Sequence, residues 1–328
     1  MHNTPATDTA TWDIVVELSH VTKYFDQVRP TSLFKREKVR VMALDDVSFS
    51  LKRGEFVAYA GPNGAGKSTT FKLLSGMLLP QSGQVCVFGI NPHKQRIDIM
   101  SKTGILFGNR SELWWDHPVS ASFEWKRTVW SIPTEVYNRM LLVVKDLLGL
   151  EEFWDVFSRE LSLGQRMRAN LGLTMLHDPQ LILLDEPTLG LDVLAKRQMI
   201  EFLKRINRDA GTTILVTSHD MDDLTEMAGR LLLINKGRIA FDGGNDELMK
   251  LTGDMRRIKL TLAGEAPEIA GANLIGRENG GFLYEYDGAK MPVSLLMRRL
   301  SEIEAVRDVE TLRAPIESVI ADLYKSWA

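Results

Sequence analysis

A glycine-rich run, GPNGAGKST, occupies residues 61–69. It follows the spacing G-x-x-x-x-G-K-[ST] from Gly61 to Ser68, directly after the apolar run FVAYA and before the helical run TTFKLLSGML. This is the strand, loop and helix setting that the pattern needs. Glycines let backbone N–H groups and a helix N-terminus converge on phosphate oxygens. We therefore expect a phosphate-binding loop, because a turn that only caps a helix would not need these flanking elements.

Within this loop, Lys67 would reach the β- and γ-phosphates of a nucleotide, and the Ser68 hydroxyl would ligate Mg²⁺. The candidate phosphate-binding residues are Gly61, Asn63, Gly64, Ala65, Gly66, Lys67, Ser68 and Thr69.

An acidic pair, Asp185 and Glu186, stands at the end of the apolar run LILLD. Ligands of a doubly wound sheet bind beyond the carboxyl ends of its strands. Asp185 would therefore hold Mg²⁺, directly or through water, and Glu186 would polarise the attacking water as general base. A strand-end acidic pair alone would be modest evidence, and the phosphate loop upstream strengthens it.

The elements that must position these residues are short, buried strands. Apolar runs at 56–60, 181–185 and 213–217 are typical of such strands. Helical periodicity lies between 118 and 160, and the basic segment at 27–40 is expected as a loop or hairpin insertion. The predicted organisation is a disordered tail at 1–12, a nucleotide-binding domain at 13–250 with a helical subdomain at about 110–175, and a C-terminal accessory domain at 251–328.

The composition is that of an ordinary globular protein: 44% hydrophobic and 25% charged residues, with a formal net charge of −3. This balance disfavours a nucleic-acid-binding protein, which usually concentrates positive charge. We see no secretory signal and no apolar run long enough to span a bilayer. The single cysteine, Cys86, excludes an internal disulfide. These features favour a cytosolic protein.

Several motifs together resemble the ATP-binding subunits of ABC transporters, over roughly residues 14–250. GPNGAGKST resembles the Walker A loop, LSLGQ at 161–165 the ABC signature, LILLDEP the Walker B strand, and LGLD at 189–192 the D-loop. The resemblance implies ATP and Mg²⁺ as cofactors. It implies an α/β P-loop NTPase fold, a RecA-like core with an antiparallel β subdomain and a helical subdomain, here followed by a small α+β domain.

The signature is usually L-S-G-G-Q, and Leu163 replaces its first glycine. In the family, the signature of one subunit caps the γ-phosphate bound at the Walker A loop of the other. The resemblance thus implies a dimer, homomeric or with a related ABC subunit, and adds Ser162, Gly164, Gln165 and Asp192 to the nucleotide site. Ser162 could also simply N-cap the helix that follows. We expect activity to survive the Leu163 substitution.

Three further residues are assigned by resemblance. His219 resembles the switch histidine, which would contact the γ-phosphate and orient Glu186; alone, it could be an ordinary strand-end residue. Phe25 would stack on adenine, with Tyr24 as the alternative and a core aromatic as the plainer interpretation. Asn109 occupies the place of the Q-loop glutamine. Its shorter amide would ligate Mg²⁺ directly or through a bridging water.

The pattern FG-x-R-x-x-LWWD, the LSLGQ signature and the trailing domain resemble subunits of ABC-2-type exporters. Their partners are separate integral-membrane permease subunits, which would hold this chain peripherally on the inner face of the cell membrane. An importer ATPase and a non-transport ABC ATPase remain alternatives. Tryptophans at 114, 115, 125 and 130 would either line a groove for a permease helix or fill the core of the helical subdomain.

Overall fold

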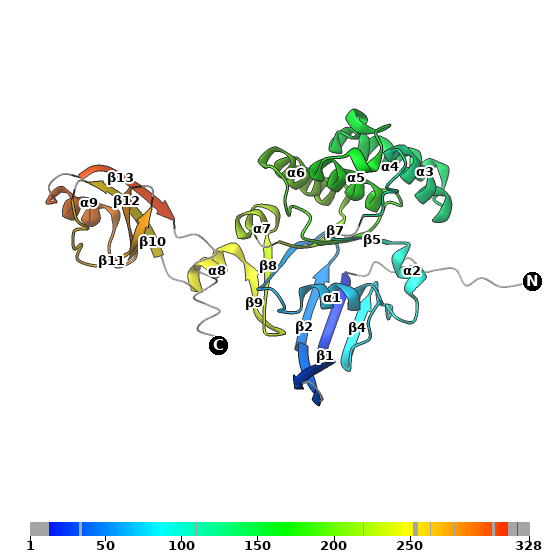
Figure 1. Cartoon of the computed structure of the whole chain (residues 1–328), viewed down its shortest axis with the longest axis horizontal. Helices are drawn as coiled ribbons and strands as arrows, with labels where there is room; N and C mark the ends of the chain where they lie inside the picture. The colour runs from blue at the N-terminus through cyan, green and yellow to red at the C-terminus, as the bar shows by residue number, and fades with distance from the viewer. Residues whose placement is uncertain are drawn as a thin grey trace, which may run out of the picture. The chain divides into compact units, whose positions relative to one another are not determined.

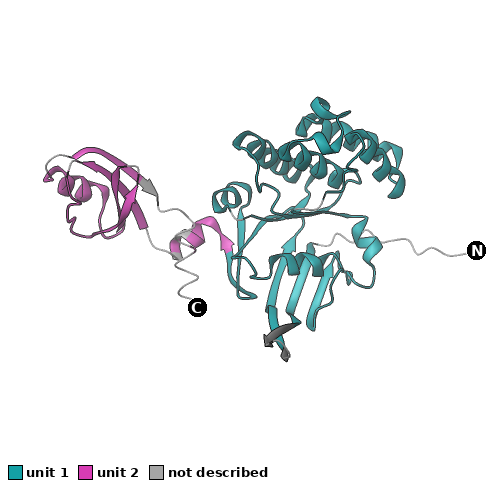
Figure 2. Cartoon of the chain, in the orientation of Figure 1, with its two compact units in different colours: residues 1–242 teal, residues 243–328 magenta. Residues whose placement is uncertain are grey.

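The computed structural model describes residues 13–32, 35–108, 111–218, 220–251, 255–262, 264–278, 280–303, 306–313 and 320. The chain divides into two compact units, Met1–Asp242 and Gly243–Ala328 (Figure 2). The division falls slightly earlier in the chain than the domain boundary expected after residue 250. The tail expected at 1–12 lies outside the described residues.

A six-stranded sheet in the order β5-β6-β7-β3-β8-β9 forms the centre of the first unit (Figure 1). Its strands are β3 (Phe56–Ala60), β5 (Thr103–Phe107), β6 (Leu181–Asp185), β7 (Thr213–Thr217), β8 (Arg230–Asn235) and β9 (Arg238–Gly244). From β5 to β8 all neighbours are parallel. The runs expected as buried strands at 56–60, 181–185 and 213–217 lie where predicted, because strands buried on both faces read as continuous apolar sequence.

A second, antiparallel sheet has the order β2-β1-β4, with β1 (Ile14–Ser32), β2 (Lys35–Lys52) and β4 (Ser82–Val87). The β1–β2 pairing continues to Ser32 and Lys35, so the expected insertion is a hairpin extension of both strands. Helix α1 (Lys67–Leu74) contacts β2 and β4 as well as β6, and lies between the two sheets (Figure 1). Their shared core includes Tyr59 and Phe71.

The remaining helices of the first unit include a layer on the other side of the central sheet (Figure 1). They are α2 (Arg96–Met100), α3 (Val119–Val129), α4 (Thr134–Leu148), η1 (Leu150–Phe153), η2 (Ser158–Glu160), α5 (Leu163–Met175), α6 (Val193–Ala210) and α7 (Met221–Met227). Helix α5 contacts α3, α4 and β5, which links the helical layer to the sheet. No helix within the described ranges is long and apolar enough to cross a membrane.

The second unit has its own antiparallel sheet, in the order β11-β12-β10-β13. Its elements are α8 (Asn245–Leu251), β10 (Met255–Leu262), β11 (Ala272–Glu278), β12 (Gly281–Asp287), α9 (Val293–Ser301) and β13 (Val306–Arg313). Ile258, Tyr284 and Leu296 are among the buried residues of a separate core. Beyond Arg313 the structure describes only Ile320.

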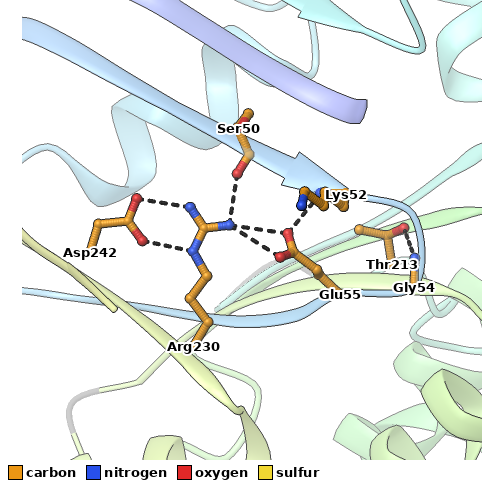
Figure 3. A network of polar contacts seen from close by, with 7 residues as sticks. All are labelled: Ser50, Lys52, Gly54, Glu55, Thr213, Arg230 and Asp242. Carbon is orange, nitrogen blue, oxygen red and sulfur yellow. Dashed lines mark hydrogen bonds and ion pairs between the residues drawn. The ribbon is translucent and has the colours of Figure 1, made fainter. Parts of the chain in front are cut away.

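Arg230 ties together the edge of the first unit where the parallel strands begin (Figure 3). Its guanidinium donates two hydrogen bonds to Asp242, at 2.7 and 2.8 Å, and one to the Ser50 carbonyl oxygen at 3.0 Å. It also pairs with Glu55 at 3.1 Å. A planar guanidinium with five donors suits such a multiple contact. These contacts fix the end of the sheet where the parallel strands begin. The predicted phosphate loop and acidic pair lie at the opposite end, where β3 and β6 end.

Candidate nucleotide site

The predicted phosphate loop joins the end of β3 to the start of α1. Gly66 has φ 119° at the N-cap of α1, a conformation that favours glycine. A side chain at Gly61 would collide with the carbonyl oxygen of Ile234 on β8. The loop therefore needs glycine at both ends of the motif, for backbone conformation at one and for close approach to β8 at the other.

Lys67 begins α1 and is 7% exposed. Its Nζ donates to the carbonyl oxygens of Gly61 at 2.6 Å and Pro62 at 3.3 Å. Burial lowers the pKa of Lys67, and the carboxylates of Glu186 and Asp185 oppose this effect. The ammonium thus lies inside the loop, close to both acidic residues of the site.

Ser68 and Asp185, the two predicted Mg²⁺ ligands, lie in direct contact. The Ser68 hydroxyl donates to Asp185 Oδ2 at 2.9 Å, and the Thr217 hydroxyl donates to Asp185 Oδ1 at 2.7 Å. Residues 68 and 185 come from α1 and β6, which the shared core holds together. Their hydroxyl and carboxylate oxygens are the hard donors that Mg²⁺ takes in nucleotide sites, so this pair fits the ion.

Glu186 follows directly after β6 and has φ 57°. A left-handed backbone costs a non-glycine residue roughly 1–2 kcal/mol and needs support from its surroundings. Here the Glu186 N–H donates to the Thr217 carbonyl oxygen at 3.1 Å and to the Thr217 hydroxyl at 3.0 Å. Thr217 therefore positions both acidic residues. We did not predict it from the sequence, where the only signal is a threonine ending an apolar strand.

A cavity of about 350 Å³ opens over this group and is lined by Ser68, Phe107, Asp185 and Glu186. A second cavity, of about 290 Å³, is lined by Glu186 together with Leu163 and Arg166 of α5. Both acidic residues thus adjoin Ser68 of the phosphate loop, and Glu186 also adjoins the start of α5, the helix that carries the signature, in the same chain.

The predicted signature and D-loop residues form helix caps. The Ser162 hydroxyl accepts a hydrogen bond from Gln165 N, and Gln165 Oε1 accepts one from Ser162 N, which is a capping box at the start of α5. The interpretation of Ser162 as an N-cap is therefore confirmed. Asp192 caps α6 with its side chain alone, since its Oδ1 accepts from Ala195 N at 2.9 Å. The Leu163 side chain lies close to Gly190 of the D-loop. A Cβ added to Gly190 would be 2.7 Å from Leu163 Cδ2.

The two candidate adenine-stacking aromatics differ in their surroundings. The Arg40 guanidinium lies 3.9 Å from the centre of the Tyr24 ring, and the Tyr24 backbone is hydrogen-bonded to the Gln81 side chain. Phe25 is 37% exposed, with Lys23 Nζ 5.2 Å from its ring centre. Phe25 is therefore not a core aromatic, and it presents the more open ring.

Asn109 and His219 lie outside the described residues. Next to Asn109, the Gly108 N–H donates to the Asp185 carbonyl oxygen at 2.9 Å, so the end of β5 adjoins the acidic pair. Next to His219, Asp220 caps α7, and its carboxylate accepts from Lys196 Nζ at 2.7 Å. Lys196 also pairs with Asp223 at 2.9 Å. No local sequence pattern marks these contacts of Lys196, so they could be found only in the structure.

The predicted tryptophan cluster is only partly exposed. Trp115 is 58% exposed, and Trp114, Trp125 and Trp130 are 36–37% exposed. Trp114 packs against Trp125 with ring centres 5.4 Å apart, and the Arg166 guanidinium lies 5.0 Å from the Trp115 ring centre. None of these side chains is a fully buried core residue, and each retains surface that another molecule can contact.

In this chain a phosphate loop joins a strand to a helix, and a second strand of the same sheet ends in Asp185, which Glu186 follows. This arrangement defines a P-loop NTPase. A profile of the family described as "ABC transporter" matches residues 44–189. The Escherichia coli protein named "Probable multidrug ABC transporter ATP-binding protein YbhF" is 32% identical over 72% of this chain, which spans 38% of the relative's length. The "Energy-coupling factor transporter ATP-binding protein EcfA" of Methanoculleus marisnigri is 30% identical over 76% of this chain and 90% of its own length.

Among solved structures, the dimeric ATP-binding cassette MJ0796 in a post-hydrolysis state, bound to ADP and Pi, matches with a TM-score of 0.60 and 24% identity. The match covers 70% of this chain and 98% of that one. The chain belongs to the family of ABC transporter ATP-binding proteins, and its first unit carries the ATPase domain of that family. The expected fold class is confirmed.

Proposed function

We propose that this chain binds and hydrolyses Mg·ATP at an interface between two ATP-binding subunits, and that it thereby powers transport through separate permease subunits. The observation that carries the hydrolytic part is the hydrogen-bonded group of Ser68, Asp185 and Thr217, which also fixes the backbone of Glu186. It supports the proposal because Ser68, Asp185 and Glu186 are held together at the end of β6, where a metal ion and an attacking water would need to meet.

Each residue has a specific task in this proposal. The loop N–H groups and Lys67 bind the phosphates, Phe25 stacks on adenine, and Ser68 and Asp185 hold Mg²⁺, which supplies charge stabilisation at the phosphates. Glu186 takes the proton of the attacking water. Asn109 and His219 complete the site, the first towards the metal ion and the second towards the γ-phosphate and Glu186.

The second half of the site comes from another subunit. Ser162, Gly164 and Gln165 lie at the start of α5, where the helix dipole favours an anion. Asp192 caps the start of α6 close by in space, since a Cβ added at Gly164 would lie 3.9 Å from Leu191 Cδ2 and 3.3 Å from Ala195 Cβ. We propose that these residues of one subunit close over the nucleotide bound to the phosphate loop of the other, in a homodimer or with a related ABC subunit.

The test of this proposal is Glu186→Gln, which keeps the shape of the side chain and removes the base. We expect ATP hydrolysis to be lost and a dimer with trapped ATP to accumulate, as measured by phosphate release and by size-exclusion chromatography with Mg·ATP. Glu201→Gln on α6, whose side chain is 75% exposed, is the matched control. Normal turnover by Glu186→Gln would overturn the assignment.

We propose further that the transport is export through an ABC-2-type permease, with the chain held in the cytoplasm at the inner face of the membrane. The partly exposed tryptophans support this proposal, since aromatic side chains are enriched at interaction hot spots. Importer and non-transport ATPases are the competing functions. The test is co-purification of the native chain and of Trp115→Ala from membranes. Export predicts polytopic membrane proteins as partners of the native chain and fewer of them with Trp115→Ala; a secreted binding protein among the partners would favour import, and no membrane partner would favour a non-transport ATPase.

A further inference from the structure

A cavity of about 650 Å³ lies among α4, α5 and α6 of the helical layer (Figure 1). It is larger than either of the two cavities beside the acidic pair. Asp178 and Thr212, which precede β6 and β7, are among the residues that line it. The cavity therefore lies towards the end of the sheet where the parallel strands begin, whereas the phosphate loop follows the end of β3. A molecule in this cavity would not occupy the nucleotide site.

The walls of the cavity are mainly apolar. Its apolar side chains come from all three helices and are Met140, Leu142, Val143, Leu147, Met175 and Ile206. Met140, Met175 and Ile206 are buried, whereas Leu142 is 72% exposed. Small organic ligands bind in cavities of about 300–1,000 Å³ whose lining is mostly apolar with a few polar groups. The size and lining of this cavity thus fit a small organic molecule with an apolar body.

The charged residues of the lining are not fully balanced. Three aspartates and two arginines line the cavity. Arg139 pairs with Asp178 at 2.6 Å, and Arg205 pairs with Asp209 at 3.4 Å. The third carboxylate, that of Asp146, is exposed, and no basic side chain in the described part of the chain pairs with it. The cavity therefore retains one uncompensated negative charge.

The helix dipoles add to this negative charge. Helices α4, α5 and α6 end at Leu148, Met175 and Ala210, and the last turn of each lines the cavity. The C-terminus of a helix carries roughly half an elementary negative charge and stabilises a cation nearby. Three such ends together with Asp146 complement a positive charge and repel a negative one.

We propose that this cavity binds an organic cation, a molecule whose positive charge is attached to an apolar ring system or chain. The apolar part contacts the cavity walls and covers Leu142, and the positive charge lies beside Asp146. This inference does not depend on the proposed function. It predicts that the cation and Mg·ATP bind to one chain at the same time.

The experiment measures binding of tetraphenylphosphonium to the full chain by calorimetry, with and without Mg²⁺ and a non-hydrolysable ATP analogue. Tetraphenylborate is the matched probe, because it has the same shape and the opposite charge. The first variant is Asp146→Asn. Its control is Glu135→Gln, which removes the same charge from an exposed position in the first turn of α4, outside the cavity lining.

A second variant tests the apolar contact. Leu142→Ala shortens an exposed side chain of the lining, so the fold should tolerate it. Val129→Ala is its control, since Val129 is 57% exposed on α3 and does not line the cavity.

We expect the native chain to bind tetraphenylphosphonium more tightly than tetraphenylborate. Asp146→Asn should weaken binding of the cation by about two- to fivefold, the range of an exposed pair of opposite charges. Leu142→Ala should weaken it by about two- to tenfold through lost apolar contact. The two controls and the ATP analogue should leave the affinity unchanged.

Three results would overturn the inference. The first is equal binding of the two probes, or binding of neither. The second is the same affinity in Asp146→Asn as in Glu135→Gln, which would show that only the net charge of the chain matters. The third is displacement of the cation by the ATP analogue, which would assign the probe to the nucleotide site.

Discussion

At the scale of single residues, Thr217 contacts both members of the acidic pair. It is fully buried, and its hydroxyl donates to Asp185 and accepts from the Glu186 N–H. Replacing it with valine keeps the shape but leaves both groups without this partner, at a cost of about 1–3 kcal/mol. We expect Thr217→Val to lower kcat for ATP hydrolysis by about ten- to a hundredfold, in proportion to that cost, with a smaller change in nucleotide affinity.

The same strand offers a control for that variant. Thr213 lies at the other end of β7, is also fully buried, and its hydroxyl accepts from Gly54 N at 3.0 Å. Thr213→Val should lose a similar amount of stability, measured by thermal melting, and retain kcat. Equal effects of both variants on kcat would show that Thr217 matters only for folding.

His177 gives the unfolding free energy a specific pH dependence. Its ordinary pKa of 6.5 is lowered to about 4 in the folded chain, first by burial and then by the Lys126 charge. The unfolded chain therefore binds a proton between these values and the folded chain does not. The stabilisation is complete above pH 6.5 and falls by about 3 kcal/mol as the pH approaches 4.

We expect His177→Gln to flatten this dependence, as measured by urea unfolding across that pH range. Exposed His93 supplies the comparison, since His93→Gln should follow the native chain. If His177→Gln and the native chain lose stability in parallel, the ring is not held neutral by its surroundings.

At the scale of elements, the packing of β5 against α5 sets where the end of β5 meets the site. A Cβ at Gly104 would lie 2.7 Å from Thr174 Cγ2 and 2.8 Å from the Thr174 carbonyl oxygen, so β5 or α5 must move to admit one. We expect Gly104→Ala to destabilise the chain by about 1–3 kcal/mol and to reduce ATP hydrolysis, because Gly108 would move with the strand. Gly229→Ala, which would meet nothing within 4 Å, should do neither.

The elements that could be predicted from the sequence are those that a short local pattern determines. Buried parallel strands read as short apolar runs, and the phosphate loop has a fixed spacing, so both were assigned without tertiary information. The basic segment at 27–40 fits either a loop or a hairpin on sequence alone, because the choice depends on pairing between β1 and β2. The links of Thr217 to Asp185 and of Lys126 to Glu112 join residues from different elements. No local periodicity encodes such contacts, and they became visible only in the fold.

At the scale of the whole molecule, the two units have separate hydrophobic cores, one around Tyr59 and Phe71 and the other around Ile258 and Tyr284. The first unit is closed at its end by β9, in which Asp242 pairs with Arg230. A core of its own is what a segment needs to fold alone. We therefore predict that residues 1–244 and 245–328 fold as separate fragments.

The first fragment should bind Mg·ATP with the affinity of the full chain, as measured by calorimetry, and each fragment should give a single cooperative urea transition. Residues 1–237 form the contrasting fragment, which lacks β9. Of the two carboxylates that pair with Arg230 in the described part of the chain, this fragment keeps Glu55 and loses Asp242. We expect that fragment to be less stable by at least about 3 kcal/mol, the lower end of the cost of removing one partner of a buried ion pair, because Arg230 and Asp242 are only partly buried. If fragments 1–244 and 1–237 are equally stable, the pairing of Arg230 with β9 does not stabilise the first unit. If fragment 245–328 fails to fold, its core depends on the rest of the chain.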